Sequence, residues 1–468
     1  MNRSDNVKIY AELRSAYPVF IYDSYTITLI NNEIVIRFAF NLNNCYFFYP
    51  ETRIVIKPGI SDVFFKKGGH LEDLNIFAFN IGMIELISYW KAACSPKVII
   101  KPHSLDQQQI NWWKKIYFNG LGEFFYLNGI NNPDEDSFME IVTEGTSIEC
   151  PQFDLDDAAA LVPIGGGKDS VVTLELLRQN QIDILPLILN PRGATIECIK
   201  AAGFTPDNIF VITRTIHPQL LELNAKGFLN GHTPFSAMLG FNTILASVLS
   251  GRKHIALSNE SSANESTVEG SSINHQYSKS FEFEQDFRNY VSRYISPKPN
   301  YFSFLRPLSE LQIADLFSHY ENYHNVFRSC NAGSKTDSWC GNCPKCLFTY
   351  TILSPFLSQE RLTAIFGKNI FADKGLIPYL RQLTGIESVK PFECVGTVDE
   401  VNASLQQTIA LNKTRELPLL LNYYRQSTAF NALAPEQFKS MLTAFNPEHN
   451  LEPRFEQIIK NALSWLSK

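Results

Sequence analysis

Hydrophobic positions along the chain change their spacing in three stages, and the first stage is alternation. Short apolar runs such as Tyr25–Ile30 and Ile34–Phe40 occupy the first 77 residues, and turn residues such as Asn31 and Asn32 separate them. Alternation with a period of two is typical of strands that bury one face. This part of the chain is therefore predicted to be rich in strands. Two helices are expected after it, at about 79–93 and 105–118.

The second stage begins near residue 158, where apolar runs of strand length alternate with helical periodicity. Strands are expected at 160–164, 183–189, 208–213, 254–258 and 301–305. Helices are expected at 170–180, 194–202, 236–250, 281–294 and 308–320. This order is typical of a parallel sheet with helices on both faces. The predicted fold class is α/β, with a doubly wound, Rossmann-like parallel sheet as its core.

The third stage follows residue 356 and is helical. Helices are expected at 359–366, 377–383, 398–411, 416–425, 435–444 and 453–466. A polar, turn-rich stretch from Pro133 to Pro151 separates the first two stages. Three domains are therefore predicted. They are a strand-rich α+β N-terminal domain over 1–150, the α/β domain over 151–355 and a helical C-terminal region over 356–468.

Composition and charge narrow the functional classes. The 468 residues are 45% apolar and carry a net charge of −6, so no global basic surface is available for nucleic acid or an acidic membrane. The first residues lack the apolar core of a signal peptide, and no run of about 18 or more apolar residues occurs. Nine cysteines without a secretion signal indicate a reducing compartment. The sequence predicts a cytoplasmic protein that neither spans a membrane nor binds nucleic acid.

The candidate chemistry begins in the stretch Gly165–Ser170, which reads Gly-Gly-Gly-Lys-Asp-Ser and lies between a predicted strand and a predicted helix. Glycines let the backbone approach a ligand, and the helix N-terminus adds free N–H groups and a positive dipole end. Lys168 adds a positive charge, Ser170 adds a hydroxyl, and Asp169 offers a ligand for Mg²⁺. The stretch is predicted to bind a polyphosphate, and the alternative is a glycine-rich turn without a ligand.

Neither common nucleotide fingerprint fits this stretch. A Walker loop needs a glycine where Val162 stands, and the dinucleotide fingerprint needs one where Ser170 stands. The stretch resembles the loop of the ATP pyrophosphatase, or PP-loop, superfamily, Ser-Gly-Gly-x-Asp-Ser, with Gly165 in place of the first serine. The resemblance implies an enzyme that splits ATP into AMP and diphosphate, usually by adenylating a substrate oxygen.

A cysteine cluster follows the predicted sheet. Its members are Cys330, Cys340, Cys343 and Cys346. Four closely spaced thiolates can surround one tetrahedral Zn²⁺, and four protein ligands leave no open position, so the predicted zinc is structural. An iron–sulfur cluster and buried free thiols are the alternatives. A glycine loop with this cysteine spacing behind it resembles 7-cyano-7-deazaguanine synthase, but that enzyme leaves the first 150 residues and about the last 110 without a counterpart.

A second resemblance covers more of the chain. Six blocks resemble, in the same order, the UDP-N-acetyl-α-muramoyl-L-alanyl-L-glutamate epimerase family of bacterial peptidoglycan synthesis. The blocks are Leu161–Glu175, Asn259–Glu265, Asn274–Asp286, Leu305–Ile313, Phe327–Phe348 and Lys390–Thr397. The resemblance implies an ATP-consuming inversion of the terminal glutamate of UDP-MurNAc-L-Ala-L-Glu. It also implies a partner ligase that adds L-Glu to UDP-MurNAc-L-Ala.

Roles for single residues follow from this resemblance and from side-chain chemistry. The nucleotide site is predicted to comprise Gly165, Gly166, Gly167, Lys168, Asp169, Ser170, Glu260 and Glu265. Lys168 would neutralise phosphate charge and Asp169 would position Mg²⁺, and both count as catalytic. Glu260 and Glu265 follow a predicted strand end, where they would bind a second Mg²⁺ or act as a base. The alternative is that they are helix-capping or surface acids.

Inversion needs one proton-transfer group on each face of a planar intermediate. His275 and Lys279 lie four residues apart and would share a face of a helix over 274–290. Histidine is a natural proton shuttle near neutral pH. The predicted catalytic pairs are His275 with Lys279 and His275 with Cys394, and a structural role for His275 is the alternative.

Three other functions compete with the epimerase. An amide or nitrile synthase of the same superfamily would need a nitrogen source. A tRNA-modifying member would need a basic face, which the net charge of −6 does not favour. A nucleotide-sensing protein would bind ATP without turnover, although Lys168, Asp169 and Ser170 are all retained. The sequence indicates neither an oligomeric state nor a role for residues 1–150.

Overall fold

The computed structural model describes residues 4–130, 134–149, 153–268, 270–271, 273–333, 336–414, 416–431 and 436–466. The chain divides into two compact units, each built from separate stretches. The first unit comprises Met1–Leu161, Phe210–Ile255 and Tyr277–Tyr301, and the second comprises Val162–Ile209, Ala256–Gln276 and Phe302–Lys468. The domain division expected at 150/151 and 355/356 stays a prediction, and the first of these boundaries lies outside the described residues.

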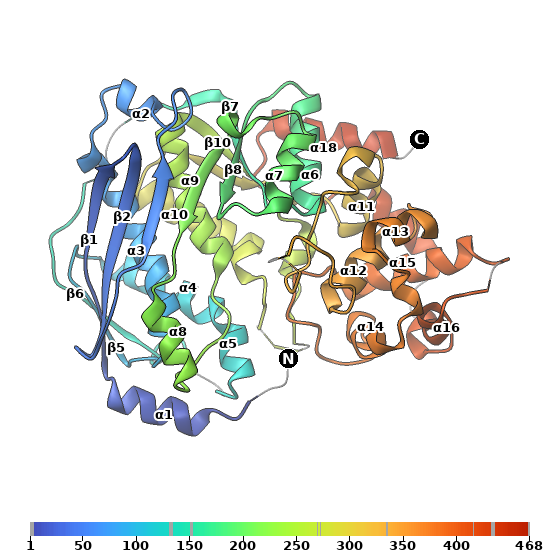
Figure 1. Ribbon diagram of the computed structural model, residues 1–468, viewed down its shortest axis with the longest axis horizontal. Helices are drawn as coiled ribbons and strands as arrows, with labels where there is room; N and C mark the ends of the chain where they lie inside the picture. Colours follow the sequence, from blue (N-terminus) through green and yellow to red (C-terminus); the bar gives the residue numbers. More distant parts are fainter. Residues whose placement is uncertain are drawn as a thin grey trace. The chain divides into compact units, whose positions relative to one another are not determined.

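Both helices and strands build the first unit, as the mixed α/β prediction requires (Figure 1). Its strands are β1 (Val19–Ile30), β2 (Glu33–Leu42), β3 (Tyr46–Phe48), β4 (Glu51–Val55), β5 (Lys97–Ile100), β6 (Glu140–Thr143) and β9 (Phe210–Arg214). Most of β7 (Asp156–Pro163) and β10 (Arg252–Leu257) and half of β11 (Asn300–Ser303) also belong to it. Its helices are α1 (Val7–Ala16), α2 (Val63–Lys66), α3 (Asn75–Trp90), α4 (Gln107–Gly120), α5 (Gly122–Leu127), α8 (Pro218–Ala225), α9 (Phe235–Ser250) and α10 (Phe281–Tyr294).

The strand prediction for the first 77 residues is confirmed in a hairpin. β1 and β2 pair antiparallel from Phe20 opposite Leu42 to Ile30 opposite Glu33. Asn31 and Asn32 connect them with φ angles of 49° and 64°. A two-residue turn with positive φ at both positions matches the twist of the strands, and asparagine tolerates that conformation. Alternation and turn chemistry therefore agree in this region.

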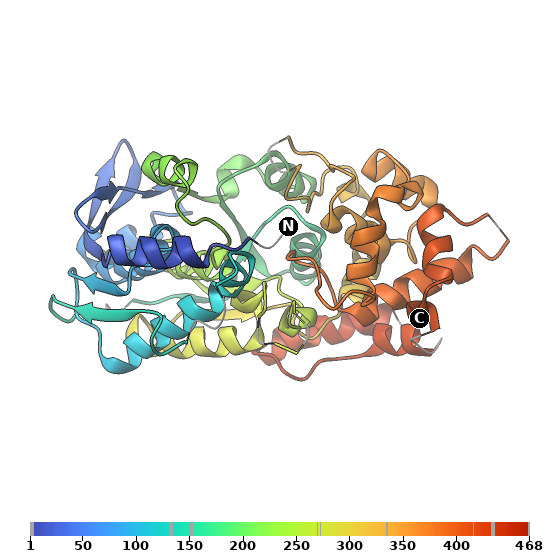
Figure 2. The same ribbon diagram turned by 90° about the horizontal axis from the view of Figure 1, so that it is seen from below.

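The long helix α3 covers this hairpin closely. Almost every residue from Ile76 to Trp90 is buried. A Cβ atom on Gly82 would lie 2.0 Å from the hydroxyl of Tyr22 on β1, so glycine permits the close approach of helix and strand. Below the hairpin, α1 runs as a separate helix, dark blue in Figure 2, and none of its residues is buried.

The second unit contains the rest of the helices. They are α6 (Lys168–Gln179), α7 (Gly193–Ala201), α11 (Glu310–Ser318), α12 (Pro344–Leu353), α13 (Gln359–Phe366), α14 (Ile377–Leu383), α15 (Val398–Leu411), α16 (Leu419–Arg425), α17 (Glu436–Thr443) and α18 (Pro453–Leu466), together with strand β8 (Asp183–Leu189). The predicted helical C-terminal region is confirmed, and its helices are drawn from orange to red in Figures 1 and 2. Among the described residues, no helix is long and apolar enough to cross a membrane.

Two parallel strands bring the loops of the site to one edge. β7 and β10 pair in parallel, with His254 opposite Ala160 and Ile255 opposite Leu161. The glycine stretch follows β7, and the acidic loop that begins near Asn259 follows β10. Because the carboxyl ends of paired parallel strands meet at the same edge, the two loops start side by side. This parallel pairing was expected, while the doubly wound arrangement as a whole stays a prediction.

Candidate functional site

The glycine stretch forms a backbone turn at the start of α6, in which Gly165 is exposed and Gly166 is buried. Gly166 has a φ of +83°, a conformation that favours glycine. A Cβ atom on Gly165 would meet nothing within 4 Å, so the space beside this residue is open. Gly167 is the residue before the first helical residue of α6, where backbone N–H groups have no acceptor within the helix. A ligand with negative oxygens can therefore approach this backbone closely.

Ser170 stabilises the turn from inside the helix. Its Oγ donates a hydrogen bond of 2.9 Å to the carbonyl oxygen of Gly167. The side chain is buried, so the hydroxyl holds the shape of the loop in this structure. A direct phosphate contact by Ser170 stays a prediction.

Lys168 is the central cation of the site. It is 2% exposed, and its ammonium contacts the carboxylates of Asp169 and Glu310. Burial by itself would lower the pKa of Lys168, but the two carboxylates outweigh burial and raise it. Lys168 is therefore positively charged at neutral pH. Its side chain does not point into bulk water but lies among acidic groups.

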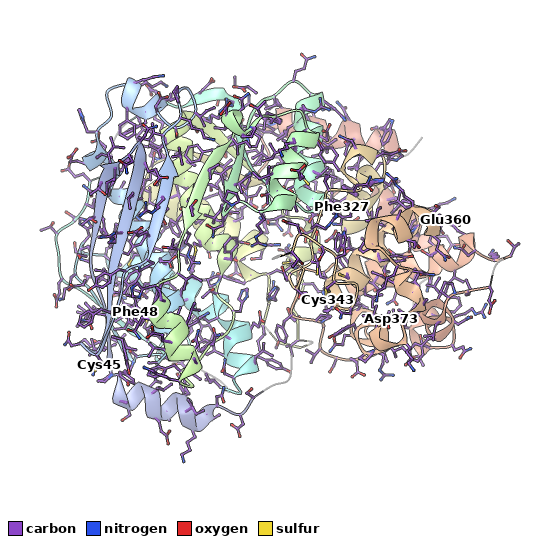
Figure 3. The ribbon with its side chains drawn as sticks, in the orientation of Figure 1. Cys45, Phe48, Phe327, Cys343, Glu360 and Asp373 are labelled. Atoms are coloured by element: carbon purple, nitrogen blue, oxygen red, sulfur yellow. The ribbon has the colours of Figure 1, made fainter. Side chains whose placement is uncertain are left out.

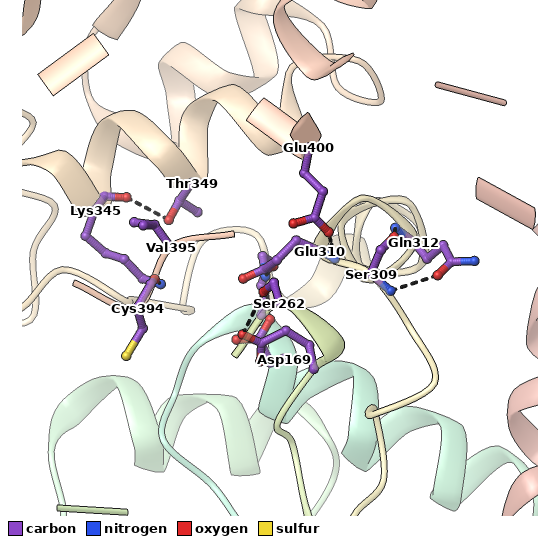
Figure 4. A network of polar contacts seen from close by, with 12 residues as sticks. Asp169, Ser262, Ser309, Glu310, Gln312, Lys345, Thr349, Cys394, Val395 and Glu400 are labelled. Atoms are coloured by element: carbon purple, nitrogen blue, oxygen red, sulfur yellow. Dashed lines mark hydrogen bonds and ion pairs between the residues drawn. The ribbon is translucent and has the colours of Figure 1, made fainter. Parts of the chain in front are cut away.

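Three of those acidic groups converge. Single carboxylate oxygens of Asp169, Glu260 and Glu310 all lie within 4.8 Å of one another. Figure 4 shows Asp169 and Glu310 side by side. Ser262 donates a hydrogen bond of 3.2 Å to Glu260, and the guanidinium of Arg306 donates one of 2.7 Å to the Glu260 carbonyl. Carboxylate oxygens at this spacing are the donor set that Mg²⁺ prefers. We call Asp169, Glu260 and Glu310 the acidic trio.

Glu310 was not predicted from the sequence to belong to the site. It begins α11, where Ser309 and Gln312 form a capping box that was visible in the sequence, but nothing there pointed to Lys168. Burial raises the pKa of Glu310, the positive charge of Lys168 opposes this, and the carboxylates of Asp169 and Glu260 add to it. The proton affinity of Glu310 therefore depends on the balance between its burial and the charges around it.

Glu265 has different contacts from Glu260 and lies outside the acidic trio. Its carboxylate pairs with the ammonium of Lys390, which also donates a hydrogen bond of 3.0 Å to the carbonyl oxygen of Gly396. Glu265 therefore fastens the segment that begins at Lys390 to the loop after β10. It does not belong to the trio, and its predicted role as a magnesium ligand or base stays untested.

The candidate proton-transfer residues do not share a helix. α10 begins at Phe281, so His275 and Lys279 both precede it. His275 belongs to the second unit and Lys279 to the first. The backbone N–H of His275 donates a hydrogen bond of 3.0 Å to Thr267. The argument from a shared helix face therefore no longer supports the pair His275 with Lys279, whose catalytic role remains a prediction.

Cys394 lies in the segment fastened by Lys390. Its side chain is partly exposed, and its carbonyl oxygen accepts a hydrogen bond from the ammonium of Lys345. The neighbouring Glu393 accepts a hydrogen bond of 2.5 Å from Asn331. Burial raises the pKa of Glu393, and the Lys345 charge opposes this shift. Glu393 was not predicted as a functional residue, although it stands beside one that was.

The four cysteines converge as predicted. Their sulfur atoms all lie within 4.8 Å of one another, with Cys330 3.8 Å from Cys343 and Cys340 3.7 Å from Cys346. Four sulfurs at about 2.3 Å from one tetrahedral zinc would be about 3.8 Å apart, so the geometry fits a single ion. Cys343, labelled in Figure 3, precedes α12, and hydrogen bonds from the thiol and backbone N–H of Cys346 lower the pKa of Cys343.

The cysteine segment is bonded to the glycine loop. The backbone N–H of Arg328 donates a hydrogen bond of 2.8 Å to the carbonyl oxygen of Gly166. Asp337 accepts hydrogen bonds of 3.1 Å and 3.0 Å from the backbone N–H groups of Gly193 and Ala194, which begin α7. An ion that ordered the cysteines would therefore also stabilise the glycine loop, through the hydrogen bond between Arg328 and Gly166.

Together the fold and these residues define a mixed α/β protein with a candidate polyphosphate site and a candidate metal centre. Residues 11–304 match the family profile described as the MurL N-terminal domain, and residues 326–437 match the MurL C-terminal domain. The chain therefore belongs to the MurL family, which confirms the family resemblance read from the sequence. Its membership of the PP-loop superfamily stays a prediction.

Curated relatives carry one name. The chain is 37% identical to the UDP-N-acetyl-alpha-D-muramoyl-L-alanyl-L-glutamate epimerase of Salinispora tropica over 71% of this chain and 73% of that one. It is 35% identical to the protein of that name from a Micromonospora strain, over 71% and 75%. It is 34% identical to the one from Xanthomonas oryzae pv. oryzae, over 79% and 82%.

Proposed function

We propose that this protein is an ATP-dependent epimerase that inverts the terminal L-Glu of UDP-MurNAc-L-Ala-L-Glu. The identity of the reaction rests on the names of relatives that match more than two thirds of the chain. The observation that carries the ATP dependence is the buried Lys168, which lies at the glycine loop against the acidic trio. A cation, open backbone N–H groups and oxygen ligands for Mg²⁺ are the three elements that a polyphosphate needs.

The proposed chemistry explains why an epimerase would consume ATP. A Cα proton beside an ionised carboxylate is very weakly acidic, because its removal places a second negative charge next to the first. If a carboxylate oxygen attacks the α-phosphorus of ATP, diphosphate leaves and the carboxylate charge is removed. A base can then take the Cα proton, and an acid can return a proton to the other face. Water finally attacks the acyl carbon and AMP leaves.

Lys168 and the glycine loop would serve the first of these steps. The backbone of Gly165–Gly167 would bind phosphate oxygens, and Lys168 would exchange one of its carboxylates for phosphate as charge moves onto the leaving diphosphate. The acidic trio would hold Mg²⁺, which when bound would neutralise phosphate charge. Oxygen ligands from three carboxylates that lie within 4.8 Å of one another favour such a cation.

The proton-transfer residues are proposed on chemistry alone. His275 with Cys394 would work on opposite faces of the planar intermediate, and Lys279 stays a candidate base on its side-chain chemistry alone. Cys394 gains support from its segment, since Lys345 and Lys390 tie that segment to residues near the trio. A structural Zn²⁺ on the four cysteines completes the proposal. The protein would act in the cytoplasm on a nucleotide-linked dipeptide that a ligase supplies.

One reaction tests the whole proposal. The pure protein is incubated in D₂O with Mg-ATP and UDP-MurNAc-L-Ala-L-Glu, and AMP, deuterium at the glutamate Cα and chirality are followed by mass spectrometry and chiral chromatography. We expect AMP, deuterium and D-Glu together. Binding of ATP without AMP or deuterium would refute the epimerase.

The cysteine spacing favours one alternative. Cys330, Cys340, Cys343 and Cys346 have the spacing found behind the loop of 7-cyano-7-deazaguanine synthase. An amide or nitrile synthase would share the adenylation step but pass the acyl group to nitrogen. Addition of ¹⁵N-labelled ammonia to the same reaction distinguishes the two, because only the synthase would transfer the acyl group to ammonia and give a product that has gained a labelled nitrogen atom.

A further inference from the structure

Three ionisable side chains connect the N-termini of three helices in the second unit. Lys168 begins α6, Glu310 begins α11, and Glu400 lies in the first turn of α15. Their exposed fractions are 2%, 2% and 4%. A buried charge is costly unless another charge or hydrogen bonds compensate it, so the partners of each group show its role.

The contacts of Glu400 described here are hydrogen bonds from neutral donors. One oxygen, Oε2, accepts hydrogen bonds of 2.7 Å from the backbone N–H of Thr397 and 3.0 Å from its hydroxyl. These contacts close the capping box of α15. The other oxygen, Oε1, accepts a hydrogen bond of 2.6 Å from the backbone N–H of Glu310. One carboxylate therefore caps its own helix and a second helix, as Figure 4 shows for Glu400 above Glu310.

The backbone N–H of Glu310 needs this acceptor. As the first residue of α11, Glu310 has no acceptor for its N–H within the helix. The nearby capping residue Ser309 is engaged by the N–H of Gln312. Glu400 therefore fixes the backbone of Glu310, and the carboxylate of Glu310 contacts the ammonium of Lys168. The connection runs from α15 through α11 to the first residue after the glycine loop.

We propose that Glu400 is a positioning residue of the nucleotide site, which holds the backbone of Glu310 so that the Glu310 carboxylate holds Lys168 beside the glycine loop. The inference rests on the proposed role of Lys168 at the phosphates. Glu400 itself touches no reacting atom. Burial raises the pKa of Glu400, and its hydrogen bonds from Thr397 and Glu310 oppose this shift.

Glu400→Gln tests the connection. An amide offers one acceptor oxygen, whereas Glu400 faces two backbone donors on opposite sides, so at least one contact is lost. We expect the KM for Mg-ATP in AMP release to rise about tenfold, the loss expected for one hydrogen bond to a charged group. If this variant fails to fold, Glu400→Asp keeps the charge but is one methylene too short to bridge both helices, and it carries the same prediction.

Thr397→Ala is the matched control. It removes one donor from the same carboxylate but leaves the hydrogen bond between Glu400 and Glu310 intact. We expect a lower melting temperature and an unchanged KM for ATP. Asp399→Asn removes the charge of an exposed neighbour and should change neither quantity. Equal effects of Thr397→Ala and Glu400→Gln on KM would overturn the inference, because Glu400 would then matter only as the cap of α15.

A double-mutant cycle gives the second readout. If Glu400 acts through Glu310, the double variant Glu310→Gln with Glu400→Gln raises the KM for ATP no more than Glu310→Gln alone, within about twofold. Additive effects would overturn the inference.

The proposed function and this inference fail separately. If the wild-type protein binds ATP but releases no AMP with the UDP-dipeptide, the proposed function fails. Affinities for Mg-ATP measured by calorimetry then test the positioning role, because we expect weaker binding in Glu400→Gln and unchanged binding in Thr397→Ala. If the wild-type protein binds no ATP, both are overturned.

Discussion

The acidic trio and the four-cysteine cluster both gather negative groups, but the chain assembles them in opposite ways. The cysteines come from one short stretch, Cys330–Cys346, and local turns bring their sulfurs to tetrahedral spacing. The trio comes from three separate elements, and Glu310 lies 142 residues from Lys168. The trio also has a cation of its own. The cluster is therefore suited to hold an ion permanently, while the trio is suited to exchange charge during a reaction.

The largest effect is expected at the four-cysteine cluster. Cys343→Ser removes one of four ligands, and structural zinc sites carry apparent binding free energies of about 10–16 kcal/mol in small peptides. We expect bound zinc, measured by inductively coupled plasma mass spectrometry, to fall from about one ion per chain to none, with a lower melting temperature. Cys45→Ser, at an exposed cysteine of the first unit, should retain the ion. Iron in place of zinc would contradict the zinc prediction.

The next largest effect is expected at the acidic trio, when its cation Lys168 loses its charge. Lys168→Met keeps a long side chain but deletes the charge, and loss of such stabilisation costs on the order of 10²–10³-fold in rate. We expect kcat for AMP release to fall by that factor while zinc content stays unchanged. Lys200→Met removes a half-exposed lysine that pairs with Glu197 on α7 and should leave the rate unaltered. A rate within a factor of about three of wild type would exclude Lys168 from phosphate chemistry.

A smaller effect distinguishes the structural role of Gly166 from the proposed ligand-binding role of Gly165. Gly166→Ala places a side chain at a φ of +83°, and its Cβ would lie 3.1 Å from the backbone of Ala194. We expect a loss of about 1–3 kcal/mol in the free energy of unfolding, measured by urea denaturation. Gly165→Ala meets no neighbour and should keep its stability but weaken ATP binding. If Gly165→Ala bound ATP as tightly as the wild-type protein, the open space beside Gly165 would have no role in ligand binding.

The smallest effect is a pH dependence. Burial raises the pKa of Glu310 above its ordinary value of 4.5 although the Lys168 charge opposes this shift, so ionisation of Glu310, which its pairing with Lys168 requires, costs more in the native state than in the unfolded state. Its contribution to stability is therefore full below pH 4.5 and declines as the pH rises above that value. Glu310→Gln lacks this titration. We expect the melting temperature of wild type relative to Glu310→Gln to fall between pH 5 and pH 8, and a rise would contradict the sign.

Sequence patterns predicted those elements whose signals are local. The bounds of α13, α14, α15 and α18 agree with the helical periodicity, and side-chain caps such as Ser358 and Thr397 mark two of their starts. α1 was missed because no buried residue gives it an apolar stripe. α12 was missed because its first turn is made of the cysteine run itself, which was interpreted as a metal loop.

The candidate site divides in the same way. The glycine stretch and the cysteines were found because the residues that act together are neighbours in sequence. The contacts of Lys168 with Glu310, Glu310 with Glu400 and Glu265 with Lys390 each join residues that are 90 or more positions apart. Only the tertiary fold brings such residues together, and a single glutamate in a helical pattern carries no signal of its partner.

The interleaving of the two units has a consequence for how the chain is made. The first unit needs residues up to Tyr301, and the second starts at Val162 and ends with the chain. On the ribosome the first unit can be completed only after the first two stretches of the second, Val162–Ile209 and Ala256–Gln276, have emerged, and the earlier of these holds Lys168 and the glycine loop. A cut after Tyr301 keeps the first unit whole but leaves the stretches Val162–Ile209 and Ala256–Gln276 without the rest of the second unit, so that truncated form would expose residues of the second unit that are otherwise buried. The candidate site cannot form until Glu310 and Glu400, which complete the contacts of Lys168, have also been synthesised.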